Sequence, residues 1–74
     1  MKPQTDWDRK ARGIIKAEMK RRDITYQQLA DRLAALGVEE TTRNVINKVN
    51  RGKFSAAFML QCLEAIEVRD LRLD

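Results

Sequence analysis

Apolar residues recur at the three-to-four-residue spacing of amphipathic helices in four successive stretches of the chain. In the first stretch a stripe begins at Trp7 and continues through Ile14, Ile15 and Met19. In the last stretch, from Phe58 to Ile66, apolar residues cover most of the circumference of the predicted helix, which must therefore be buried. The pattern predicts helices over about residues 6–22, 26–36, 42–51 and 55–67.

Residues that begin and end helices support these bounds. Each predicted helix follows a residue that can cap its N-terminus: Thr5, Thr25, Thr41 or Thr42, and Ser55. Thr25 and Gln28 have the spacing of a capping box, in which each side chain bonds the backbone of the other residue. Gly37 and Gly52 suit the left-handed conformation that ends many helices. The sequence therefore predicts a single all-α domain of four helices over residues 1–74.

The last six residues, 69–74, have a different pattern. From Asp70 onward charged and apolar residues alternate, as in a short strand, and the chain offers no other strand to pair with it. We expect this tail to pair with a second copy of the chain or to fray.

The length of the chain favours a dimer. A domain of 74 residues buries only about 60% of the surface of its unfolded chain. The predicted fourth helix also has more apolar surface than three short helices can cover. We therefore expect a homodimer whose interface contains Phe58, Met59, Leu63, Leu71 and Leu73. Trp7 and Phe58 are expected to be core or dimer contacts, because both fall on apolar stripes.

The composition excludes most kinds of enzyme active site. The chain has no His and a single Cys, Cys62, which excludes a Cys/His zinc site, an intrachain disulfide and a His-activated nucleophile. It also has no phosphate-binding loop and no pair of carboxylates in an apolar setting. We expect no enzyme activity, no cofactor and no metal, and interpret Cys62 as a small core residue. No apolar stretch reaches the ~18 residues of a membrane span and the N-terminus lacks an apolar signal core, so a cytoplasmic protein is expected.

Positive charge is concentrated in two segments. The net charge is +4 and the pI about 9.6. Residues 9–22 contain seven basic residues and one acidic residue, and residues 43–53 contain four basic residues and no acidic one. Such segments favour an anionic partner.

The predicted helix 42–51 combines this charge with side chains that can read bases. At about 100° per residue, Val45, Ile46 and Val49 share one side. The opposite side carries two amides and three cations without an acid: Arg43, Asn44, Asn47, Lys48 and Arg51. Asn can pair with adenine and Arg with guanine in the major groove of DNA. Asn is also a poor helix former, so two exposed Asn residues in one helix indicate a functional reason.

The chain resembles the lambda-repressor-like, Cro/CI-type helix-turn-helix family from Ile24 to about Val68. The matching segments are Ile24-Thr25-Tyr26-Gln27-Gln28-Leu29-Ala30, Gly37-Val38 and Val49-Asn50-Arg51-Gly52-Lys53. The chain departs from the family in a first motif helix nearly one turn longer and in Asn50, where Glu is common. It is also similar to a group of small uncharacterised bacterial domains that share Arg51-Gly52-Lys53-Phe54-Ser55. The resemblance to the larger family implies double-stranded DNA binding by a dimeric transcriptional regulator.

These observations give two sets of expected DNA contacts. The expected base contacts are Arg43, Asn44, Asn47 and Lys48. The expected phosphate contacts are Lys16, Lys20, Thr25, Gln27, Gln28, Arg51 and Lys53, of which Thr25, Gln27 and Gln28 lie at a helix N-terminus with free amides. The alternative is a small helical adaptor that binds an acidic protein with the same basic surfaces and does not read DNA.

Overall fold

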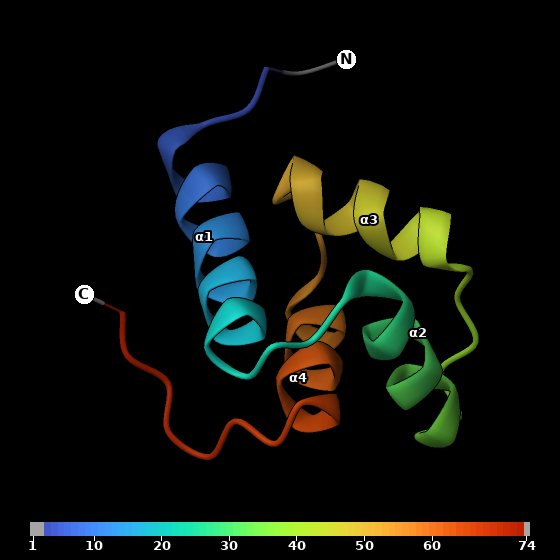
Figure 1. Ribbon diagram of the computed structural model, residues 1–74. Coiled ribbons are helices and arrows are strands. Elements are labelled where there is room, and N and C mark those ends of the chain that lie inside the picture. Colours follow the sequence, from blue (N-terminus) through green and yellow to red (C-terminus); the bar gives the residue numbers. More distant parts are fainter. Residues whose placement is uncertain (1–2, 74) are drawn as a thin grey trace.

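Four helices make up the regular structure of residues 3–73, the part of the chain that this computed structural model describes (Figure 1). They are α1 (Asp6–Arg21), α2 (Tyr26–Ala35), α3 (Thr42–Arg51) and α4 (Ala56–Ala65). Helices α3 and α4 each pack against both α1 and α2. The prediction of an all-α domain with four helices is confirmed, and the predicted bounds differ from these by at most two residues.

The predicted caps explain why the helices begin where they do. The Thr25 hydroxyl accepts a hydrogen bond from the amide of Gln28 at 3.1 Å, and the Gln28 side chain accepts one from the amide of Thr25 at 2.8 Å. Thr41, not Thr42, caps α3 by accepting from the amide of Asn44 at 3.0 Å. These bonds satisfy amides at the helix N-termini that have no partner within the helix.

Each of the four helices contributes the buried residues of one side to a common hydrophobic core. Its fully buried large residues are Ile15, Leu29, Leu33, Val45, Val49, Cys62 and Ile66. Phe58 and Leu63 belong to the same core, with 6% and 5% of their surface exposed. The prediction that these two residues lie in a dimer interface is therefore wrong, because both are buried in the core of a single copy, where α1 and α2 pack against α4. Cys62 is confirmed as a core residue, and burial raises the pKa of its thiol to about 12.

The tail after α4 forms no strand within the described residues. From Ile66 to Leu73 the chain runs back towards α1 without a strand partner (Figure 1). Leu71 and Leu73 are 40% and 61% exposed. Residues 69–73 thus form no strand within one copy, which agrees with a frayed tail, and pairing of this tail with a second copy stays a prediction. Asp74 lies outside the described residues.

Trp7 does not enter the core. Its side chain is 78% exposed, and the neighbour on its ring is the ammonium group of Lys10, 5.9 Å from the ring centroid. At about 100° per residue, Trp7 is turned by roughly 80° from Ile15 and 120° from Met19, the residues by which α1 enters the core. Of the two positions predicted for Trp7, the core position is wrong for this reason, and the dimer contact stays a prediction.

No helix within residues 3–73 is both long enough and apolar enough to cross a membrane.

Candidate nucleic-acid interface

Helix α3 has one side fixed in the core and the other in solvent. Val45 and Val49 are 0% exposed, and α1 and α2 pack against the helix on this side. The exposed side carries Arg43, Asn44 and Asn47 and no acidic residue. The structure thus places three of the four predicted base-contact residues together on one exposed surface.

Lys48, the fourth predicted base-contact residue, lies at the edge of this surface, and its ammonium group is bound to other parts of the chain. Its ammonium group pairs with Glu40, in the connector before α3, and lies 4.9 Å from the centroid of the Phe58 ring. The charge of Lys48 is therefore already partnered by an acid and by the negative face of an aromatic ring. This contact joins the connector, α3 and α4, which gives Lys48 a structural role.

The end of α1 and the start of α2 form a second basic surface. Lys16, Lys20 and Thr25 line one shallow cavity of about 290 Å³ between the two helices. Gln27 is exposed on the first turn of α2, while Thr25 and Gln28 use their side chains to cap the helix. Two predicted phosphate contacts of α1 thus lie beside the positive end of the α2 dipole, an arrangement that favours an anion.

Tyr26 lies under this cavity with its hydroxyl group buried. The hydroxyl oxygen has no hydrogen-bond partner among the described residues. Burial raises the pKa of Tyr26, and the charge of Arg12 partly opposes the rise. A buried hydroxyl without a partner destabilises the fold, so the packing of the ring must account for the position of Tyr26.

Lys53, a predicted phosphate contact, is bound within the chain. Its ammonium group pairs with Asp8 of α1 and donates to the carbonyl of Pro3 at 3.1 Å. The hydrogen bond from Lys53 and a second one from the amide of Thr5 lower the pKa of Asp8 to about 2. Asp8 thereby neutralises Lys53, so a phosphate would have to displace a carboxylate to reach it.

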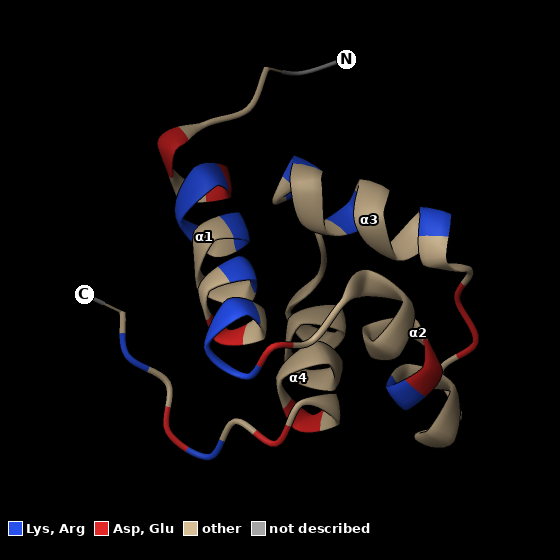
Figure 2. Ribbon diagram, viewed as in Figure 1, with Lys and Arg blue, Asp and Glu red and all other residues tan. Residues whose placement is uncertain are grey.

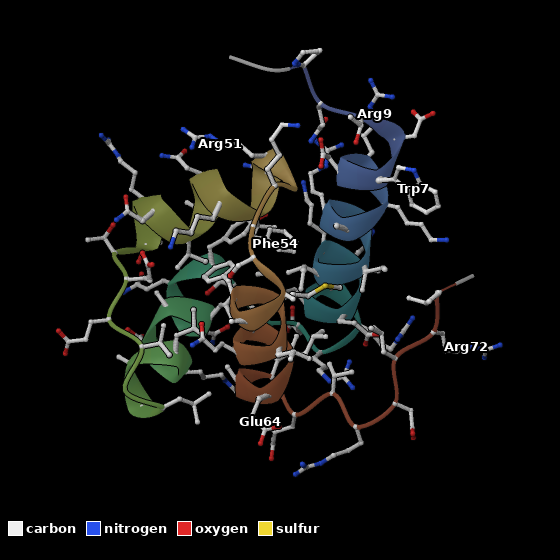
Figure 3. The ribbon with its side chains drawn as sticks, turned by 180° about the vertical axis from the view of Figure 1, so that it is seen from behind. Trp7, Arg9, Arg51, Phe54, Glu64 and Arg72 are labelled. Atoms are coloured by element: carbon white, nitrogen blue, oxygen red, sulfur yellow. The ribbon has the colours of Figure 1, made fainter. Side chains whose placement is uncertain are left out.

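Arg51, at the end of α3, borders a cleft between the N-terminal segment, α3 and α4. The cleft has a volume of about 660 Å³ and is lined by Gln4, Lys48, Asn50, Arg51, Lys53, Phe54, Ser55 and Phe58. The Gln4 amide closes one side by donating to the carbonyls of Asn50 and Arg51, at 2.9 and 3.1 Å. Figure 3 shows Arg51 at the end of α3 that faces the start of α1, and Phe54 turned inward below it. No local sequence pattern predicts this cleft, because the N-terminal segment that forms one of its walls is distant in the sequence from α3 and α4.

Positive charge follows α1 and α3, whereas α4 has no basic residue (Figure 2). Glu18 binds Arg21 and Arg22. Burial raises the pKa of Glu18, but the hydrogen bond from Arg22 and the charge of Arg21 outweigh this effect and hold the pKa below its ordinary value. Within residues 3–73, four of the six charged residues among the predicted contacts form no ion pair: Lys16, Lys20, Arg43 and Arg51. These cations are the ones available to an anionic partner.

Residues 7–71 match the model of a protein family described as a domain of unknown function, DUF6471. The chain belongs to the DUF6471 family. Comparison with curated proteins and with solved structures found no match. The matched region of this DUF6471 domain includes all four helices except the first residue of α1, and therefore both basic surfaces. No group of three or more His, Cys, Asp or Glu residues that could hold a metal ion occurs in the described part of the domain.

Proposed function

We propose that this DUF6471 domain binds double-stranded DNA in a sequence-specific manner and acts as a transcriptional regulator. In this proposal α2 and α3 form a helix-turn-helix, and α3 enters the major groove. The role requires access to the chromosome and therefore a cytoplasmic protein.

The main support for this proposal is the exposed side of α3, which has no acidic residue. Arg43, Asn44 and Asn47 extend into solvent from a helix whose opposite side is anchored by buried valines. A ten-residue helix is about 15 Å long, and the major groove, about 12 Å wide, accepts a helix. The two amides offer a donor and an acceptor each, which suits the edge of adenine, and Arg43 offers the paired donors that suit guanine.

The unpaired cations supply the phosphate contacts in this proposal. Lys16 and Lys20 lie beside the N-terminus of α2, and Arg51 lies at the far end of α3. Contact with phosphate positions a protein on DNA without specifying sequence. Lys48 and Lys53 contribute less, because Glu40 and Asp8 already bind them.

Selection of bound sites from a pool of random duplexes tests the proposal. Once a preferred site is known, the affinities of Asn44→Ala and Asn47→Ala for that site and for a scrambled duplex are compared with those of the unaltered protein. Each substitution should lower affinity for the preferred site by roughly five- to 150-fold, the equivalent of one base contact, and leave affinity for the scrambled duplex nearly unchanged. Glu64→Ala is the matched control, because Glu64 lies at the end of α4 away from α3 (Figure 3).

Two results would contradict the proposal. An equal loss on both duplexes would show that the Asn residues do not read bases. A complete absence of duplex binding at low salt would remove DNA as the partner and favour an acidic protein bound by the same surfaces.

A further inference from the structure

The outward side of α1 from Trp7 to Ala17 is an exposed surface that carries none of the proposed DNA contacts. Trp7, Lys10, Gly13, Ile14 and Ala17 recur along it at helical spacing. Trp7 is the only tryptophan of the chain, is 78% exposed and points away from the other helices (Figure 3). An exposed Trp of this kind is typical of a protein interface.

A groove lies on the same side of α1, next to the C-terminal tail. It has a volume of about 460 Å³, and Gly13, Ile14 and Ala17 line it together with Arg72 and Leu73 of the tail. A Cβ atom added at Gly13 would meet nothing within 4 Å, so the space over this residue is open. Glycine is an unfavourable residue in the middle of a helix, and its presence here keeps the groove wide.

We propose that a second copy of this chain covers this surface, with the two α1 helices packed antiparallel about a twofold axis near Gly13. Trp7 of each copy then lies opposite Ala17 of the other and fills its groove. A twofold interface needs a surface that is complementary to itself. The outward side of α1 meets this condition, because the large side chain and the small residues that can receive it lie on one helix, ten residues apart.

The charges at the two ends of α1 favour antiparallel over parallel packing of the two α1 helices. Asp6, at the start of α1, has a side chain that is 94% exposed and pairs with Arg9 of the same helix, and Lys20, which is also a proposed phosphate contact, is exposed near the end of the helix. Antiparallel packing with Trp7 opposite Ala17 brings Asp6 of one copy near Lys20 of the other, and it also sets the two helix dipoles in opposite directions. Parallel packing would instead bring the two basic C-terminal ends together, where like charges repel.

Sedimentation and tryptophan fluorescence of the whole chain test this interface without DNA, so the outcome is independent of the proposed function. We expect a dimer that dissociates on dilution, with Trp7 emission moving to longer wavelength as it dissociates. Trp7→Ala and Gly13→Gln should each raise the dissociation constant of the dimer at least about tenfold. The space over Gly13 is open and Gln is a better helix former than Gly, so Gly13→Gln should not unfold the monomer. Leu60→Ala is the control, because Leu60 is 66% exposed on α4, outside this surface.

Exchange of the two charges tests the antiparallel orientation. Asp6→Lys and Lys20→Glu should each weaken the dimer, and the double variant should restore it, because opposite charges face each other again. A monomer at roughly several hundred micromolar, a dimer that Trp7→Ala and Gly13→Gln leave intact, or a double variant no tighter than the single variants would each overturn the proposal.

Discussion

Gly52, which ends α3, lies directly against the backbone of Asp8 in the first turn of α1. A Cβ atom at Gly52 would be 2.0 Å from the Asp8 carbonyl oxygen, and the φ angle of Gly52 is +69°. Both the contact and the backbone conformation therefore require glycine at this position.

Gly52→Ala should accordingly lower the free energy of unfolding by about 2 to 5 kcal/mol, the sum of a strained left-handed residue and a forced backbone shift. Gly37→Ala is the matched control, because Gly37 has a φ angle of +85° but nothing within 4 Å of an added Cβ. That substitution should lower the free energy of unfolding by only about 1 kcal/mol. Urea denaturation measures both, and similar losses in the two variants would contradict the close packing of Gly52 on Asp8.

The ion pair between Asp8 and Lys53 should make stability depend on pH in acid. The pKa of Asp8 is about 2 in the folded protein, against an ordinary value of 3.8. A lowered folded pKa means that the unfolded chain binds the proton more readily, so the contribution of Asp8 is fully present above pH 4. It should be lost as the pH falls from about 4 to 2.

Comparison with Asp8→Asn isolates this contribution from that of Glu18, whose pKa is also lowered. The difference in free energy of unfolding between the two proteins should be constant near neutral pH and shrink below pH 4. A difference that stays constant down to pH 2 would show that Asp8 does not titrate with a lowered pKa. NMR titration of the Asp8 carboxyl provides a direct check.

The buried hydroxyl of Tyr26 should contribute nothing to stability. Because it has no partner among the described residues, Tyr26→Phe removes a desolvated polar group and keeps the ring. We expect the free energy of unfolding to stay the same or to rise by up to about 1 kcal/mol. Tyr26→Ala, which also removes the ring, should lower it by about 2 kcal/mol. A clear loss in Tyr26→Phe would mean that the hydroxyl has a partner in solution.

The helices could be predicted because their determinants are local. The Thr25–Gln28 capping box involves residues three apart, and the apolar side of α3 follows from the spacing of Val45 and Val49. For the same reason Arg43, Asn44 and Asn47 could be assigned to the exposed side of α3 from the sequence alone, whereas the partners of Lys48 could not. The capping box, the apolar side and the exposed side each depend only on the spacing of residues within one helix.

The remaining features depend on contacts between distant segments. Asp8 and Lys53 are 45 residues apart, and no local pattern relates them. Glu40, in the connector before α3, and Lys48, in the second half of that helix, are eight residues apart, and no pattern of a single helix relates them. Trp7 lies on an apolar stripe like a core residue, but the packing of α3 and α4 on another side of α1 leaves it in solvent.

The same contacts divide the lysines into two classes that DNA binding should distinguish. Lys16 and Lys20 form no ion pair within residues 3–73, whereas Lys48 is bound to Glu40 and the Phe58 ring. If DNA is the partner, Lys16→Ala and Lys20→Ala should weaken binding to all duplexes alike. Each should reduce the slope of log affinity against log salt concentration by about 0.9, the value for one phosphate contact.

Lys48→Ala should leave that slope nearly unchanged and instead lower the free energy of unfolding by up to about 1 kcal/mol, since it breaks a partly exposed ion pair and a cation–π contact. Anisotropy titrations at several salt concentrations, with denaturation curves of the same variants, separate the two effects. A slope reduced by Lys48→Ala as much as by Lys16→Ala would show that Lys48 leaves Glu40 to bind phosphate.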